Sequence, residues 1–343
     1  MKNIFLILTV IFTQNIFSDS LIVQNESKYF KSIKQITFGG SNAECYYSVD
    51  GKQFIYQASK DNYPCDRIFT MNTDGTNNKL VSTGTGRTTC AFFVPNSNKI
   101  IYSSTHEFSD DCLPTPDRSK GYLWAVYNAY DVFIADADGK NLQNLTKSFG
   151  YDAECVVSPD GKTILFTSNR DGDLEIYSMD LNGNNLKRLT FEKGYDGGGF
   201  FSPDGKKIIY RAHRPINDSD KIAGEELLKQ ELVQPTHMEL FIMDSDGKNK
   251  IQLTNNGAAN FAPYFTPNGK KIIFSSNLHN PKGWNFDLFL IDIKTKNIEQ
   301  VTFSPGFDGF PMFSYDGNKL VFASSRNAKQ RHEFNIFEVE WNK

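Results

Sequence analysis

The chain has 343 residues, of which 39% are hydrophobic and 14% aromatic, enough for a large buried core. Its formal net charge is −3, and like charges form no block along the sequence. The composition therefore excludes the basic surface of a nucleic-acid-binding protein.

The N-terminus reads as a targeting segment. Lys2 precedes an apolar run at residues 4–12, and the small residues Ser18 and Ser20 follow. This run is too short to span a bilayer, and its order of charge, apolar stretch and small residues is typical of a secretory signal peptide. We predict a signal peptide at residues 1–20, a linker at 21–34 and one domain at 35–343, with a periplasmic or secreted location.

Six copies of one pattern follow residue 34. Each copy has a strand, a turn, an apolar strand, an alternating strand, a tight hairpin such as Asn182-Gly183, and an ending such as Leu189-Thr190. The six turns are Ser48-Val49-Asp50-Gly51, Val94-Pro95-Asn96-Ser97, Ser158-Pro159-Asp160-Gly161, Ser202-Pro203-Asp204-Gly205, Thr266-Pro267-Asn268-Gly269 and Ser314-Tyr315-Asp316-Gly317. A unit of short strands cannot bury its apolar face alone, so the repeats predict an all-β, six-bladed β-propeller of four-stranded blades.

The two chain ends predict how the ring closes. The last repeat stops after its third strand at residues 334–339, while an unassigned fourth strand at 35–38 precedes the first repeat. We predict that this N-terminal strand completes the last blade and removes the exposed edges.

Two repeats carry insertions between their second and third strands, at about residues 107–129 and 214–237. The second contains a predicted amphipathic helix within 218–234. The first contains Trp124 and several tyrosines that could stack on sugars, cap a peptide or pack within the insertion. Both insertions should rise from the face where the first strands enter, and we predict that this face binds the ligand.

One polar residue per repeat lies near the start of each first strand. This predicted ring consists of Asn42, Arg87, Asp152, Asp196, Asn260 and Asp308. Around a common channel it could bind a cationic group, a cation or a peptide, with Glu154 as a further acceptor. Alternatively, these residues cap turns between the blades.

Histidines and cysteines leave further alternatives open. His106, His213 and His279 follow second strands and could converge on a transition metal, or they could be isolated loop residues. We place Cys45, Cys90 and Cys155 at one repeat position shortly before the turn, and Cys65 and Cys112 in loops on the same face. A disulfide is expected outside the cytoplasm, but the sequence does not decide which cysteines pair or whether most are small buried side chains.

The motifs Ser158-Pro159-Asp160-Gly161-Lys162, Thr167-Ser168-Asn169-Arg170-Asp171-Gly172 and Leu189-Thr190 resemble the PD40 (WD40-like) repeats of the TolB family. The resemblance covers about residues 35–340 and implies a six-bladed propeller. For TolB it implies a periplasmic, protein-binding role in the Tol–Pal envelope system. The present chain resembles a stand-alone form, without the α/β domain that precedes the TolB propeller. Oligogalacturonate lyases have similar repeats and a His-rich manganese site, but they have seven blades.

These observations favour a monomeric binding module for an envelope protein or peptide, acting through the insertion-bearing face. No cofactor is assigned, although a divalent cation in the channel is an alternative. The alternative functions are a metal-dependent lyase of the oligogalacturonate type and a glycan-binding propeller. Whether the protein is an enzyme stays open, with binding favoured because no GxSxG or HExxH motif is present.

Overall fold

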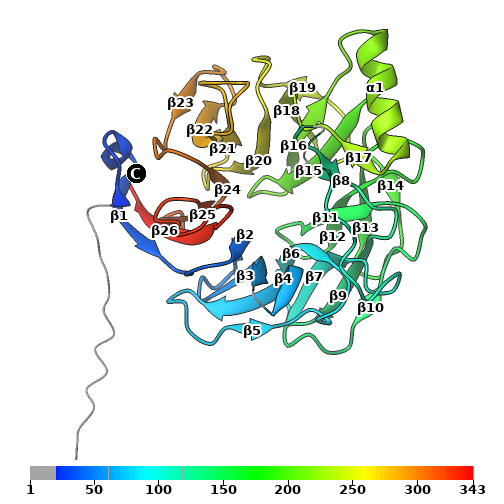
Figure 1. The fold of residues 1–343 in the computed structure, drawn as a ribbon, viewed down its shortest axis with the longest axis horizontal. Helices are drawn as coiled ribbons and strands as arrows, with labels where there is room; N and C mark the ends of the chain where they lie inside the picture. Colours follow the sequence, from blue (N-terminus) through cyan, green and yellow to red (C-terminus); the bar gives the residue numbers. More distant parts are fainter. Residues whose placement is uncertain (1–20, 61, 118, 120, 343) are drawn as a thin grey trace, which may run out of the picture.

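The computed structural model describes residues 21–60, 62–117, 119 and 121–342, and these form six four-stranded antiparallel sheets arranged around an axis (Figure 1). Blade 1 contains β2 (Ser41–Tyr47), β3 (Gln53–Lys60), β4 (Tyr63–Asn72) and β5 (Lys79–Leu80). Blade 2 contains β6 (Thr88–Val94), β7 (Lys99–Ser104), β9 (Asp131–Asp136) and β10 (Gln143–Asn144). Blade 3 contains β11 (Asp152–Val157), β12 (Thr163–Ser168), β13 (Glu175–Asp180) and β14 (Lys187–Arg188).

Blade 4 contains β15 (Tyr195–Phe201), β16 (Lys207–His213), β18 (Met238–Asp244) and β19 (Ile251–Gln252). Blade 5 contains β20 (Asn260–Phe265), β21 (Lys271–Ser276), β22 (Asp287–Asp292) and β23 (Ile298–Gln300). Blade 6 contains β24 (Asp308–Phe313), β25 (Lys319–Ser324), β26 (Asn335–Trp341) and β1 (Phe30–Gln35). The predicted six-bladed, four-stranded propeller is confirmed.

The Ser-Pro-Asp-Gly pattern is explained by the hydrogen bonds of the turn. In blade 3 the Asp160 carboxylate accepts from the Ser158 hydroxyl and the Lys162 amide, and Gly161 N donates to Ser158 O. Gly161 has a φ of +72°, and a Cβ there would lie 2.4 Å from Pro95 O of the preceding blade. Glycine is therefore required both by the backbone conformation and by the close approach of the neighbouring blade.

The Leu-Thr ending also recurs for a physical reason. In every blade a hydroxyl at the end of the fourth strand accepts a hydrogen bond, at 2.8 to 3.1 Å, from a backbone amide of the third strand. The six hydroxyls belong to Ser82, Thr146, Thr190, Thr254, Thr302 and Thr37. Each blade thus ends its outer strand by satisfying an otherwise unpaired backbone donor.

The strand that joins the chain ends lies slightly earlier than expected. Strand β1 spans Phe30–Gln35 and pairs with β26, whereas the sequence analysis placed the strand at 35–38 and a linker before it. Ile36 and Thr37 continue the contact, because Ile36 N donates to Ile336 O and Thr37 accepts from Ile336 N. A 3-10 turn, η2 (Glu26–Lys28), precedes β1, so residues assigned to a linker pack as part of the propeller.

Aromatic side chains of the first strands meet on the axis. We call Tyr46, Phe92, Phe200 and Tyr264 the axial plug. The ring centroids of Tyr46 and Phe200 lie 5.7 Å apart, although blades 1 and 4 are opposite each other in a ring of six. Tyr46 also contacts Phe92 at 5.5 Å, and Phe200 contacts Tyr264 at 5.3 Å. The plug therefore closes the middle of the channel.

The two insertions lie where they were predicted and join each other. The second forms helix α1 (Asp218–Lys229), which begins after Asn217, whose side chain accepts from Asp220 N, and lies at the periphery in Figure 1. Strand β17 (Leu232–Val233) after this helix pairs with β8 (Trp124–Ala125) of the first insertion. No helix among the described residues is long and apolar enough to cross a bilayer. The predicted signal peptide, residues 1–20, lies outside the described residues.

Candidate functional site

A large cavity of about 890 Å³ lies at the axis and is lined by residues of the first insertion together with residues of the blades. Aromatic side chains from blades 5 and 6 line one part of it, namely Phe261, Trp284, Phe286, Phe307, Phe310 and Phe334. The charged side chains that line it are Glu44, Asp66, Arg87, Glu154, Arg211 and Arg331. A concave site of this size with both apolar and charged walls is typical of a ligand site. We call it the axial cavity.

A bulge in each first strand shapes the floor of the axial cavity. At every bulge one residue has a left-handed backbone, with φ between 47° and 58°, and the register of the strand pair shifts there. These residues are Glu44, Cys90, Glu154, Gly198, Ala262 and Phe310. All six also line a smaller recess that continues the floor toward the plug. Bulges re-aim side chains, and here they place one residue of each blade at the axis.

The first insertion forms a roof over the axial cavity. Trp124 lies edge-on to Phe261 of blade 5, with 6.1 Å between the ring centroids, and the Arg211 guanidinium lies 5.0 Å from the Trp124 ring. Tyr122 contacts Trp284, which is 67% exposed, at 5.2 Å. The insertion of blade 2 thus reaches across to blade 5 on the opposite side of the ring. Its aromatic side chains line the cavity and also pack within the roof.

Glu154, a predicted acceptor, is held firmly in the wall of the axial cavity. Its carboxylate pairs with Arg211 and accepts from Tyr195 Oη at 3.0 Å and from Gly198 N at 2.9 Å. Thr167 Oγ1 donates to it at 2.6 Å. A carboxylate with this many donors is satisfied by the protein itself, so Glu154 organises the wall.

Glu44 occupies the same bulge position as Glu154, but among the described residues it has no arginine partner of the kind that Arg211 provides for Glu154. Its carboxylate has the Tyr46 hydroxyl at 3.5 Å, and no ion pair joins it to a basic side chain within the described part of the chain. The pKa of Glu44 is raised to about 7, chiefly by burial and also by the negative charges of Glu154 and Asp66, while Cys90 and Arg211 act in the opposite direction. The site therefore holds a half-buried carboxyl group whose charged form is costly.

We expect Glu44→Gln to stabilise the protein at alkaline pH. The folded state holds the proton of Glu44 more tightly than the unfolded state does, so the wild type loses stability as pH rises from about 4.5 through 7. The loss by pH 8 should be roughly 1–3 kcal/mol for a shift of this size. Denaturant unfolding should show the variant more stable at pH 8 and equal to the wild type at pH 4. Glu340→Gln, at an exposed position, should show no such pH-dependent difference, and equal curves for Glu44→Gln would contradict the argument.

The predicted polar ring is mostly buried between the blades. Asn42, Asp152, Asp196, Asn260 and Asp308 are each 0% exposed and do not line the axial cavity. Each of the three aspartates pairs with an arginine eighteen residues further on: Asp152 with Arg170 at 2.8 Å, Asp196 with Arg214 at 2.5 Å, and Asp308 with Arg326 at 2.8 Å. We call these pairs the arginine clasps. Asn42 and Asn260 instead donate to backbone carbonyls, those of Phe334 and Met238.

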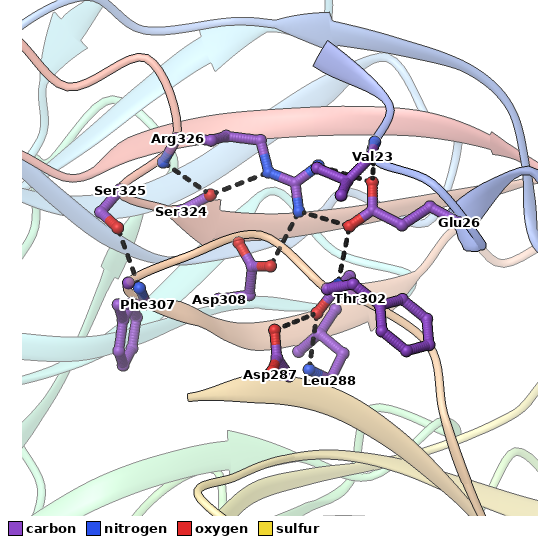
Figure 2. A network of polar contacts seen from close by, with 12 residues as sticks. Val23, Glu26, Asp287, Leu288, Thr302, Phe307, Asp308, Ser324, Ser325 and Arg326 are labelled. Atoms are coloured by element: carbon purple, nitrogen blue, oxygen red, sulfur yellow. Dashed lines mark hydrogen bonds and ion pairs between the residues drawn. The ribbon is translucent and has the colours of Figure 1, made fainter. Parts of the chain in front are cut away.

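The clasp in blade 6 includes a second carboxylate, that of Glu26, and Figure 2 shows this network. Arg326 donates to both Asp308 and Glu26, and Glu26, which is 0% exposed, also accepts from Val23 N and Phe303 N. Arg326 N and Nε both donate to Ser324 Oγ. The clasp therefore ties the segment before β1 to blade 6 and to the end of blade 5. These contacts give Asp308 a structural role; the sequence analysis had offered the capping of turns between the blades as the structural alternative for the ring.

Two residues of blade 2 need a corrected register. Thr88 pairs with Ser104 as Asp152 pairs with Ser168, so Thr88 and not Arg87 is the buried member of the ring. Cys90 likewise takes the bulge position of Glu44 and Glu154, whereas Cys45 and Cys155 come one residue after the bulge. Arg87 instead lines the axial cavity, 3.9 Å from Asp66. Both residues were placed one position out because the repeat was aligned on Cys90, which lies four residues before the turn residue Val94, whereas Cys155 lies three before Ser158.

The three predicted histidines stay apart from one another and from the axial cavity. His106 Nδ1 lies 2.8 Å from Ser104 Oγ, His213 Nε2 lies 3.3 Å from Asp220, and His279 Nδ1 lies 3.5 Å from Asp287. Within the described residues, no three or more His, Cys, Asp or Glu side chains group closely enough to hold a metal ion.

Cys65 and Cys112 form a disulfide, and Cys45, Cys90 and Cys155 are buried free thiols. Cys65 belongs to β4 of blade 1, and Cys112 belongs to the first insertion of blade 2. The bond therefore anchors one end of the roof, while the pairing of β8 with β17 anchors the other.

Comparisons with known proteins agree with the propeller fold. The model of the TolB β-propeller domain (PD40) matches residues 123–234. A protein of Agrobacterium tumefaciens assigned as TolB is 19% identical, with a TM-score of 0.61 over 89% of this chain and 91% of the other. TolB of Acinetobacter baumannii is 22% identical, with a TM-score of 0.59 over 86% of this chain and 66% of the other. An oligogalacturonate lyase in complex with manganese is 12% identical, with a TM-score of 0.53 over 91% and 93%. A search of the curated proteins found no significant match. At these identities the solved structures show a shared fold.

Proposed function

Because the chain is a TolB-like propeller of PD40 repeats, we propose that it is a periplasmic or secreted binding module that takes a peptide segment of an envelope protein into the axial cavity. The observation that carries this proposal is the roofed cavity of about 890 Å³, which is lined by both aromatic and charged side chains. The TolB-like fold supports the binding role, and the predicted signal peptide and the Cys65–Cys112 disulfide support a location outside the cytoplasm.

The chemistry of the walls favours a peptide over a sugar. Phenylalanine supplies most of the aromatic surface of blades 5 and 6, and Phe261, Phe307 and Phe310 pack against one another at 5.7 to 6.1 Å. Such a cluster offers an apolar pocket with few hydrogen-bond donors or acceptors, which suits apolar side chains better than the hydroxyl groups of a glycan. The charged side chains that line the cavity can hold the polar groups of a peptide chain.

The proposal predicts that Trp124 is a main contact. Heptapeptides with free N-termini can be selected from a displayed library on the wild type, and the enriched sequences synthesised for calorimetry. We expect micromolar binding and a loss of tenfold or more, about 1.4 kcal/mol, in Trp124→Ala. Tyr122→Ala, at a more exposed position of the roof, should also weaken binding, whereas Phe191→Ala, an exposed aromatic outside the cavity, should not.

A second assay on the same variants tests whether the cavity binds a glycan instead. Oligogalacturonates are added to the wild type and to Trp124→Ala while the melting temperature is measured. Stabilisation of the wild type alone would assign the cavity to a glycan. Failure to enrich any peptide, or equal affinity of the enriched peptides for Trp124→Ala, would refute peptide binding in the cavity. Circular dichroism and melting curves establish that each variant is folded.

A further inference from the structure

We propose that the floor of the axial cavity is a subsite for an ammonium group on an apolar stem, with Glu44 as the carboxylate that receives it. The ammonium group belongs to a lysine side chain or to the N-terminus of a bound chain. This inference rests on the proposed function, because it names the chemistry that the same cavity selects.

The charges that line the axial cavity leave Glu44 without a partner. Three carboxylates and three guanidinium groups line it. Arg211 pairs with Glu154, and Arg87 lies 3.9 Å from Asp66. The third guanidinium, of Arg331, belongs to an exposed residue in the loop between β25 and β26. Among the described residues, the half-buried carboxylate of Glu44 thus has no ion-pair partner of its own, and a bound cation would supply one.

The neighbour of Glu44 in the ring of bulges is Phe310 of blade 6. Both residues line the axial cavity and the recess below it. Phe310 belongs to the cluster formed with Phe261 and Phe307. Aromatic rings attract a cation by their faces and cover an apolar stem by contact. A carboxylate beside phenylalanine rings therefore matches a group with a positive end and an apolar body.

Local structure holds Glu44 in position for this role. Its backbone is left-handed at the bulge, with a φ of 47°, a conformation that directs the side chain away from the ladder of β2 and β3. The raised pKa of Glu44 is consistent with a site prepared for a positive charge, because a bound ammonium group would favour the ionised carboxylate. A metal ion fits less well, since no group of three suitable ligands exists within the described residues.

The test compares 2-phenylethylammonium with its neutral analogue 2-phenylethanol, each titrated by calorimetry into the full-length mature protein at pH 8. We expect the wild type to bind the amine at least tenfold more tightly than the alcohol. In Glu44→Gln the two affinities should differ by less than twofold, while Glu340→Gln keeps the wild-type ratio. N-acetyl-lysine amide and leucine amide, titrated in parallel, distinguish a lysine side chain from a free N-terminus.

A second measurement separates binding from folding. Selective labelling of the glutamate side chains allows the Glu44 carboxyl to be followed by NMR, and the amine should lower its pKa while the alcohol should not. Equal binding of amine and alcohol, or an unchanged preference in Glu44→Gln, would overturn the subsite even if peptides bind through Trp124. Amine binding that depends on Glu44 would uphold the subsite even if the peptide selection fails.

Discussion

Replacing Asp308 by alanine is expected to lower the free energy of unfolding by about 1–3 kcal/mol, because it removes one buried acceptor of the Arg326 guanidinium. Asp308 and Glu26 are 0% exposed, and Arg326 is 6% exposed. In Asp308→Ala the guanidinium keeps Glu26 but loses the acceptor 2.8 Å away. Urea unfolding followed by tryptophan fluorescence measures the change.

Two comparisons decide whether the loss comes from the acceptor that Arg326 no longer has. Glu26→Gln/Asp308→Leu/Arg326→Met, which replaces the whole network with uncharged groups, should be less destabilised than Asp308→Ala. Glu226→Ala, which breaks the exposed pair with Lys229 on α1, should change stability by less than about 1 kcal/mol. A change below 1 kcal/mol in Asp308→Ala would show that the clasp does not stabilise the fold.

Removing the disulfide should also have a large effect. The bond joins residues 47 positions apart. A disulfide that closes a loop of this length contributes about 2–4 kcal/mol to the free energy of unfolding, because it restricts the unfolded chain. We expect Cys65→Ser/Cys112→Ser to melt several degrees lower than the wild type. The same variant should bind the selected peptides more weakly, since one anchor of the roof is lost while the blades stay intact.

The wild type treated with dithiothreitol provides a second route to the same state, and Cys45, Cys90 and Cys155 stay buried in it. Treatment should reproduce the lower melting temperature and weaker binding of the double variant, and should not alter the variant itself. If affinity stays unchanged in both preparations, the roof does not depend on the disulfide.

The fold could be predicted from the sequence because the same kind of turn and the same kind of strand ending recur in each of the six blades. The Ser158 turn and the Thr190 hydroxyl each satisfy backbone groups within one blade, so their spacing alone identifies a blade. The positions of the insertions followed from the intervals between turns. The strand at the N-terminus was placed a few residues late, since Phe30 and Ile33 pack as a strand without resembling the recurring ending.

The candidate site was harder to predict because it depends on bulges. An alternating pattern gives no sign that an extra residue turns Glu44 or Phe310 toward the axis. The three aspartates of the ring do share one position in their blades, but their pairing with arginines was not apparent from one strand alone. The missing signal was the arginine eighteen residues after Asp152, Asp196 and Asp308, a spacing that pairs the two only once the first two strands are aligned. Trp124 was correctly assigned to the insertion-bearing face, and it lines the cavity.

The axial plug has a consequence for how a ligand is exchanged. Tyr46, Phe92, Phe200 and Tyr264 leave the molecule shaped as a cup and not as a tube, and a separate hollow of about 270 Å³ lies on the other side of the plug. A polymer cannot thread along the axis from one face to the other, so it can enter only by an end or as a bent loop. A bound ligand must therefore leave the cavity through the same opening by which it entered before another ligand can bind. Capture and release would then share one route, and the roof that crosses that route would set the pace of both.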